Sequence, residues 1–141
     1  MKVKFRKFTI SDYPAVRSLW KRAGIKLTLS DERSEIARML KRNPFTCFLA
    51  ELDGELVGAV MGSWDGRRGF VHHLAVEPEY HLRGIGRAMM EQLEKRFAEM
   101  EVVKITFLVE NDNIGVVDFY RRLGYVLRDD LTALSKTLRT E

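Results

Sequence analysis

The stretch HHLAVEPEYHLRGIGRAMM, residues 72–90, decides how this chain is interpreted. Its first part ends an apolar strand, and after a turn Gly84 and Gly86 stand at the start of a helix. Glycines there let a ligand come close to the backbone, and the free N–H groups of a helix start carry the positive end of the helix dipole. Arg83 and Arg87 add positive charge beside them. The stretch therefore predicts a cradle for a phosphate or pyrophosphate.

Other interpretations of these glycines are weaker. A dinucleotide-binding fingerprint needs a third glycine after Gly84 and Gly86, and the chain is too short for a doubly wound fold. A nucleotide P-loop needs Gly-Lys-Ser/Thr, which is missing here. When the motif is considered alone, a tight turn that binds no ligand remains an alternative interpretation.

Hydrophobic spacing outward from this stretch predicts a mixed α/β chain. The dipeptide Asp53-Gly54 between two apolar runs predicts a hairpin, because both residues tolerate positive φ. The order of elements is strand, two helices, three strands, helix, strand, helix and two weaker strands, which places antiparallel strands first and a helical crossover later. The expected strands are 3–8, 45–51, 56–64, 69–77, 102–109, 125–128 and 131–138, and the expected helices start at 11, at 30 or 31, at 84 and at 113.

Composition limits the number of domains, the classes of partner and the location that can be expected. A chain of 141 residues with 45% hydrophobic and 31% charged residues is predicted to be one globular domain, residues 1–141. The net charge of +4 is scattered and the chain has no aromatic-basic motif, so no nucleic-acid partner is expected. The longest uncharged stretches, 56–64 and 43–50, are far shorter than the roughly 18 apolar residues of a spanning helix, so no membrane span is expected. Cys47 is the only cysteine, which favours a reducing, cytoplasmic location.

Two motifs together are similar to those of a known family. The run from His81 to Gly86 resembles the Arg/Gln-x-x-Gly-x-Gly/Ala signature of GNAT acyl-CoA-dependent N-acetyltransferases, with His81 in place of the usual Arg or Gln. About 30 residues later, Asn113, Phe119-Tyr120 and Gly124-Tyr125 resemble the family's second signature. The resemblance covers nearly the whole chain. It implies a GNAT fold, with a mixed, mostly antiparallel sheet of about 6–7 strands and about four helices.

The resemblance also implies how acetyl-CoA, the expected co-substrate, would bind. Strand residues would pair with the pantetheine arm, the loop would hold the pyrophosphate, and Asn113 would hydrogen-bond the arm. No metal is expected. The implied cofactor-binding residues are Leu74, Ala75, Val76, His81, Leu82, Arg83, Gly84, Ile85, Gly86, Arg87, Asn113 and Tyr120.

Acetyl transfer to an amine needs a base for the ammonium and an acid for the departing thiolate. By the resemblance, Tyr120 stands near the sulfur and is the expected acid, with a core aromatic as the alternative. His72 is the candidate base, since its placement is similar to a histidine of GNAT enzymes that act on arylalkylamines. A purely structural strand histidine remains the alternative. His72 and His73 are expected on opposite faces of their strand, so that only one of them can reach the site.

The expected activity is acetyl transfer from acetyl-CoA to a primary amine by direct attack in a ternary complex. The acceptor, whether a small amine, a protein lysine or a protein N-terminus, stays open, and a non-catalytic acyl-CoA-binding module on the same fold is the alternative. Members of the family are often dimers, so a homodimer is one expected state. Trp20, Trp64 and Glu110 are the candidate acceptor residues, with core or strand-edge roles as alternatives for the two tryptophans.

Overall fold

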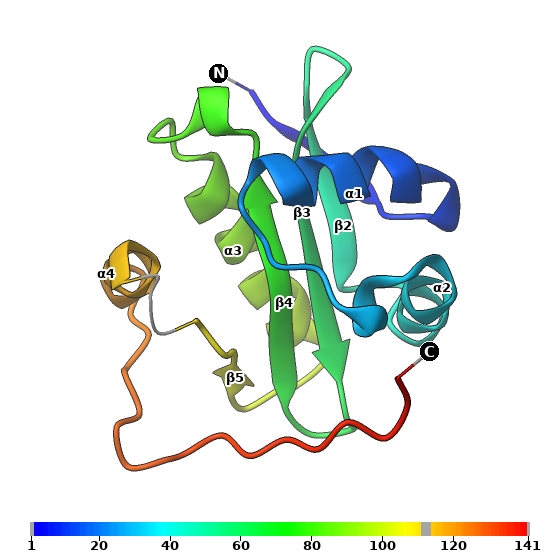
Figure 1. Cartoon of the computed structure of the whole chain (residues 1–141). Helices are drawn as coiled ribbons and strands as arrows, with labels where there is room; N and C mark the ends of the chain where they lie inside the picture. The colour runs from blue at the N-terminus through cyan, green and yellow to red at the C-terminus, as the bar shows by residue number, and fades with distance from the viewer. Residues whose placement is uncertain (1, 111–113, 141) are drawn as a thin grey trace. The chain divides into compact units, whose positions relative to one another are not determined.

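The computed structural model describes residues 2–110 and 114–140. The chain divides into two compact units, Met1–Phe107 and Leu108–Glu141. The first contains the sheet, and the second contains one helix followed by an extended segment (Figure 1).

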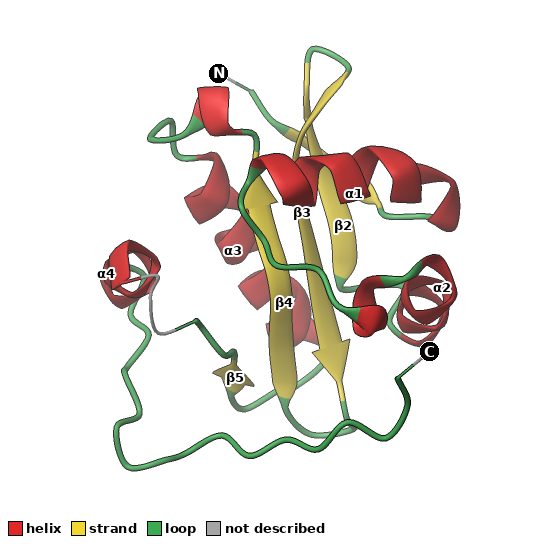
Figure 2. Cartoon of the chain, viewed as in Figure 1, coloured by secondary structure: helices red, strands yellow, loops and turns green. Residues whose placement is uncertain are grey.

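The first unit is built on a sheet that has five strands among the described residues. The strands β1 to β4 follow one another as antiparallel neighbours, and β5 joins β4 in parallel (Figure 2). A parallel pair needs a crossover, which the helix α3 (Ile85–Glu99) supplies. The strands are β1 (Lys4–Lys7), β2 (Cys47–Leu52), β3 (Glu55–Trp64), β4 (Gly69–Val76) and β5 (Ile105–Thr106).

Helices α1 (Tyr13–Arg22) and α2 (Arg33–Arg42) cover one face of the sheet. In α1 the apolar residues Val16, Leu19 and Trp20 recur at helical spacing and are fully buried. Between the two helices lies the short 3-10 helix η2 (Leu29–Asp31). The core of this layer therefore forms between α1, α2 and the near side of β2, β3 and β4.

Helix α3 packs on the opposite face at very short range, because the sheet presents glycines to it. A Cβ atom added to Gly62 would lie 2.8 Å from Leu93 and 3.0 Å from Phe97. Gly58 meets Met89 and Gly69 meets Phe97 in the same way. The sequence of β3 and β4 thus sets how closely α3 approaches.

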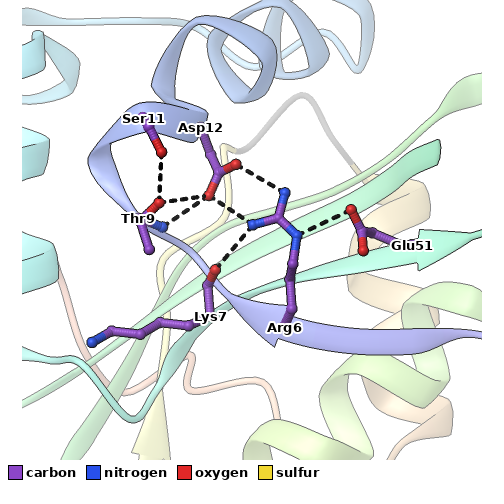
Figure 3. A network of polar contacts seen from close by, with 6 residues as sticks. All are labelled: Arg6, Lys7, Thr9, Ser11, Asp12 and Glu51. Atoms are coloured by element: carbon purple, nitrogen blue, oxygen red, sulfur yellow. Dashed lines mark hydrogen bonds and ion pairs between the residues drawn. The ribbon is translucent and has the colours of Figure 1, made fainter. Parts of the chain in front are cut away.

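A charged network fastens the edge strand β1 (Figure 3). The Arg6 guanidinium donates to both carboxylate oxygens of Asp12, at 3.0 and 2.9 Å, and to Glu51 of β2 at 3.0 Å. These hydrogen bonds from Arg6 lower the pKa of Asp12, although partial burial opposes them. The network joins β1, the 3-10 helix η1 (Ile10–Asp12) and β2.

Several expectations about the elements are confirmed. The four expected helices are present, α4 (Ile114–Arg122) being the last. The hairpin turn has φ of 52° at Asp53 and 80° at Gly54, as a two-residue turn of this type requires. Gly124, at φ 97°, ends α4.

The expected sheet of 6–7 strands is wrong, since the described residues form five. The strand expected at 102–109 is reduced to Ile105–Thr106, and 125–128 and 131–138 contain no strand. Val103 and Leu134 are more than 90% exposed, so their side chains have no neighbouring strand to pack on. β-branched and apolar residues form a strand only where a partner strand is present. None of the helices in the described part of the chain combines the length and apolar composition needed to cross a membrane.

Gly62→Ala should destabilise the protein, because the new methyl group meets Leu93, Phe97 and Thr46 at 3.0 Å or less. Overpacking of this kind costs about 1–3 kcal/mol, which corresponds to a fall of about 3–10 °C in Tm for a chain of this size. The matched control is Gly115→Ala in α4, where nothing lies within 4 Å of the added carbon. Thermal unfolding of both variants is the measurement, and an unchanged Tm for Gly62→Ala contradicts the packing described.

Candidate active site

The loop between β4 and α3 turns sharply where the sequence predicts a phosphate cradle. Leu82 has φ 63° and is fully exposed, and Gly84 has φ 82° as the N-cap of α3. Only glycine adopts this left-handed conformation without strain. The Arg22 guanidinium holds the start of the loop by donating to both carboxylate oxygens of Glu77, the shortest contact being 2.6 Å. The loop is thus tied to the end of α1.

Helix α3 begins without a side-chain cap. Ala88 N donates to Gly84 O at 3.0 Å, so the N–H groups of Ile85, Gly86 and Arg87 precede the first bond within the helix. Ile85 is buried and anchors this first turn. The three N–H groups at the positive end of the helix dipole form a site suited to an anion.

Positive side chains flank this helix start. The Arg83 guanidinium lies 5.1 Å from the centre of the Tyr80 ring, and Arg87 pairs with Glu91 at 2.9 Å. A shallow pocket of about 250 Å³ adjoins the loop on the side of β1. It lies beside the cradle and does not include the β4 residues expected to bind the cofactor. Its lining residues are Lys2, Val3, Phe5, Arg83, Gly84, Ile85 and Ala88.

The edge of β4 beyond its second residue is open. Strand β4 pairs with β5 only at Gly69 and Phe70, so among the described residues no strand pairs with that edge from 71 to 76. Leu74, Ala75 and Val76 lie on this stretch. Such an edge offers backbone N–H and C=O groups to an extended ligand that carries amides. At the end of this stretch, the His81 ring of the loop donates to Val76 O at 3.0 Å.

A β-bulge interrupts β4 at His73. The register with β3 shifts between Ala59, which faces Ala75, and Met61, which faces His72. His73 has φ 50°, a left-handed conformation inside a strand. A bulge inserts one unpaired residue and bends the strand. The bend lies immediately before Leu74, the first of the three strand residues that are expected to pair with the pantetheine arm.

The bulge places both histidine rings on the face covered by α1. The His73 ring lies edge-on to the Trp20 ring, with centroids 5.0 Å apart. His72 Nε2 and Ser63 Oγ lie 3.0 Å apart, and Ser63 faces α1 because the preceding Gly62 faces α3. The expectation that the two histidines point to opposite faces is wrong. The extra residue of the bulge breaks the alternation on which that expectation rests.

The surroundings of His72 keep its ring neutral. His72 is exposed, but desolvation by the surrounding protein, together with the nearby His73, lowers the pKa of its ring below the ordinary value of 6.5, and the carboxylate of Asp31 opposes this only in part. A neutral imidazole with a ring nitrogen able to accept a proton is what a base requires.

Asp31 is a buried carboxylate at the expected start of the second helix. Its Oδ1 lies 2.6 Å from His73 Nε2, and its side chain is 8% exposed. Burial alone would raise the pKa of Asp31, but hydrogen bonds from His73 and Thr28 outweigh it and lower the pKa. An Asp close to an expected helix start is a common capping signal, so nothing in the sequence pairs it with a histidine 42 positions away.

The candidate acceptor residues differ in accessibility. Trp20 is fully buried between Tyr13 and His73, and its indole Nε1 has no hydrogen-bond partner in the described structure. This burial favours the core role for Trp20. Trp64 ends β3 with 40% of its surface exposed, and its backbone N–H donates to Asn43. Glu110 is exposed and belongs to the second unit.

Tyr120 lies on α4 in the second unit. Its ring is nearly buried between Phe119, at 5.0 Å, and Tyr125, at 5.8 Å between centroids. Burial raises the pKa of Tyr120 to about 12, so its hydroxyl stays protonated at neutral pH. Asn113, the other residue of the second motif, lies outside the described residues.

Comparison with known proteins gives a consistent picture. Residues 13–125 match the model of the acetyltransferase (GNAT) family. The chain is 35% identical to an acetyltransferase of Sodalis glossinidius over 136 residues, 96% of each chain. It is 36% identical to an acetyltransferase of Pectobacterium atrosepticum over 130 residues, 92% of each chain.

A solved structure shares the fold at low sequence identity. The PaiA N-acetyltransferase of Thermoplasma acidophilum, in complex with coenzyme A, superposes with a TM-score of 0.82 at 18% identity and covers 92% of each chain. The bulged β4 and the uncapped glycine start of α3 agree with these matches. The chain therefore belongs to the GNAT family of acetyltransferases.

Proposed function

We propose that this acetyltransferase moves the acetyl group of acetyl-CoA to a primary amine by direct attack within a ternary complex. The observation that carries the proposal is the open edge of β4, which is followed, after the loop 77–83, by the left-handed Gly84 and the uncapped start of α3. The edge offers backbone partners for amides, and the helix start offers N–H groups for an anion.

The residues present fit coenzyme A. The backbone groups of Leu74, Ala75 and Val76 would pair with the amides of the pantetheine arm. The loop 81–87 would hold the pyrophosphate through the N–H groups of Ile85, Gly86 and Arg87, with Leu82, Gly84 and the charge of Arg83 beside them. His81, which replaces the family's usual Arg or Gln, donates to Val76 O instead of pointing a fixed charge at the phosphates. We therefore expect backbone groups to dominate phosphate binding. Asn113 would hydrogen-bond the arm.

His72 would act as the base. The bound thioester supplies an activated acetyl carbon, and the acceptor must lose one ammonium proton before its nitrogen can attack. The neutral His72 ring can take that proton, either directly or through one water molecule. The C–N bond then forms as the C–S bond breaks.

Tyr120 would protonate the departing thiolate. Its buried hydroxyl keeps its proton at neutral pH, because its pKa is raised to about 12. The resemblance of the second motif implies that this residue would lie near the sulfur. As the amide forms, its nitrogen loses a second proton, which returns to Tyr120. The exchange therefore leaves an acetylated amine, free CoA and one proton on His72.

The acceptor is proposed only as a class. The exposed Trp64 and Glu110 would border it, Glu110 by contacting a cationic group, whereas the buried Trp20 would support the site from the core.

The rival proposal is an acyl-CoA-binding module without catalysis. Release of CoA separates the two when the protein is given acetyl-CoA with an alanine-starting peptide, N-α-acetyl-lysine, spermidine or neamine. Two further statements remain predictions: that residues 1–141 form one functional domain, and that the chain forms a homodimer.

Acetyl-CoA and CoA should raise Tm by several degrees, since a ligand at 100 times its Kd adds about 2.7 kcal/mol to stability. Pantetheine without the phosphates should do so weakly. Gly86→Glu should remove the shift by placing a negative charge among the N–H groups. Its Tm without ligand should not fall, because an acidic side chain in the first turn favours the helix.

Ala98→Glu, at an exposed position near the other end of α3, is the matched control and should keep the shift. A full shift in Gly86→Glu contradicts the placement of the pyrophosphate, and no shift of the natural protein at millimolar acetyl-CoA contradicts the proposed function.

Tyr120→Phe should lower kcat about 100-fold, at the lower end for a positioned acid because a thiolate is a good leaving group. The ring and its packing remain, so Tm should barely change and the Kd of acetyl-CoA should stay within about threefold. Steady-state kinetics with the best amine of the four, together with ligand-induced thermal shifts, provide the measurement. Retention of more than half of kcat, where chemistry limits the rate, rules out Tyr120 as the acid.

His72→Ala should remove a limb of the pH profile. In the natural protein kcat/KM should fall as pH drops through a pKa below 6.5, because the lowered pKa of His72 means that the ring takes up its proton only in more acidic solution. The variant should lose this limb and react about 100-fold more slowly. Glu110→Gln is the comparison variant, and if the limb disappears there instead, the base has been misassigned.

A further inference from the structure

We propose that His73 is a positioning residue: clamped by Asp31, it holds the bulge of β4 and thereby fixes the His72 ring for proton transfer. This inference rests on the proposed role of His72 as the base. It assigns to Asp31 and His73 a part in the reaction that neither motif of the sequence indicates.

The backbone of His73 is the first support. Four non-glycine residues of the described structure have positive φ, and three of them, Asp53, Leu82 and Glu101, lie in turns. His73 is the one inside a strand. A left-handed residue in a strand is strained, and it persists only where its surroundings hold it.

The contact with Asp31 keeps His73 in this strained conformation. Because Asp31 is ionised and can only accept, His73 Nε2 must carry the proton of the 2.6 Å hydrogen bond. A hydrogen bond to a buried carboxylate is stronger than one between neutral groups. The ring is also packed against the edge of Trp20, which leaves it little freedom.

Asp31 is itself fixed from two sides. Its other carboxylate oxygen accepts from the Thr28 amide at 3.0 Å and from the Thr28 hydroxyl at 3.4 Å. Its backbone carbonyl accepts from the Tyr13 hydroxyl of α1 at 2.6 Å. The clamp therefore joins β4 to η2 and α1, and its parts are held by the protein core.

The consequence for the site follows from chain geometry. His72 and Leu74 are bonded to His73 on either side, so the backbone of His73 sets the direction of both. On the face under α1, the ring of His72 is held by the bond to Ser63 and by the position of its neighbour. The titratable groups that interact with His73 are Asp31 of η2 and His72 on its own strand, and Tyr13 of α1 bonds to the backbone of Asp31.

Two variants separate the clamp from the backbone strain. His73→Gly adopts positive φ freely but has no clamp, whereas His73→Gln is strained there but keeps an N–H donor near the position of Nε2. We expect His73→Gly to keep Tm within about 5 °C and to bind acetyl-CoA within about threefold. Its kcat should fall about 10- to 100-fold, and His73→Gln should recover much of that loss. Asp53→Gly, at φ 52° in the hairpin turn, is the matched control and should leave kcat unchanged.

The double variant His72→Ala/His73→Gly tests whether His73 acts through His72. If it does, the double variant reacts no more slowly than His72→Ala alone. A loss equal to the product of both single losses overturns the proposal, as does His73→Gly retaining more than half of kcat while His72→Ala loses tenfold. An unchanged rate in His72→Ala instead refutes the proposed base.

A measurement without acceptor keeps the proposal testable if none of the four amines reacts. The proton and carbon NMR signals of the His72 ring report its surroundings. They should shift in His73→Gly and return toward their original positions in His73→Gln, with Asp53→Gly as the control. Signals that stay in place in His73→Gly overturn the clamp whatever the acceptor is.

Discussion

The left-handed backbone of His73 is the constraint on which the site depends. By inserting one residue opposite β3, it bends β4, and beyond Phe70 no pairing joins β4 to β5. The local distortion at His73 accounts for the two histidine rings on one face, and it lies within the stretch of β4 that β5 leaves open.

The other face of the sheet meets a different constraint. Because Gly58, Gly62 and Gly69 lack side chains, α3 lies close against β3 and β4. The start of α3 follows the end of β4 after a short loop, so the depth at which the helix packs also sets where its N–H groups stand relative to the open edge. Glycines far from the loop in sequence thus contribute to the position of the helix start that is proposed to bind phosphate.

Local signals in the sequence predict much of this. Asp53-Gly54 specifies a turn in which both residues have positive φ, and Gly84 predicts the left-handed start of α3. Both depend on the conformational preferences of adjacent residues, which a sequence carries directly. The two histidines illustrate the limit. Strand alternation holds for a regular strand, but the bulge arises from contacts with Trp20 and Asp31, which lie more than 40 positions away.

The missing strands have the same origin. Apolar residues in 125–128 and 131–138 favour an extended chain, yet a strand forms only when its backbone pairs, and no partner strand accompanies them in the described structure. Asp31 shows the converse. Its role as a capping residue is local and visible, since its carboxylate accepts from Thr28, while its second oxygen serves a distant histidine. A residue that satisfies a local pattern can therefore carry a second, tertiary interaction, and here that interaction holds the one strained position of the strand.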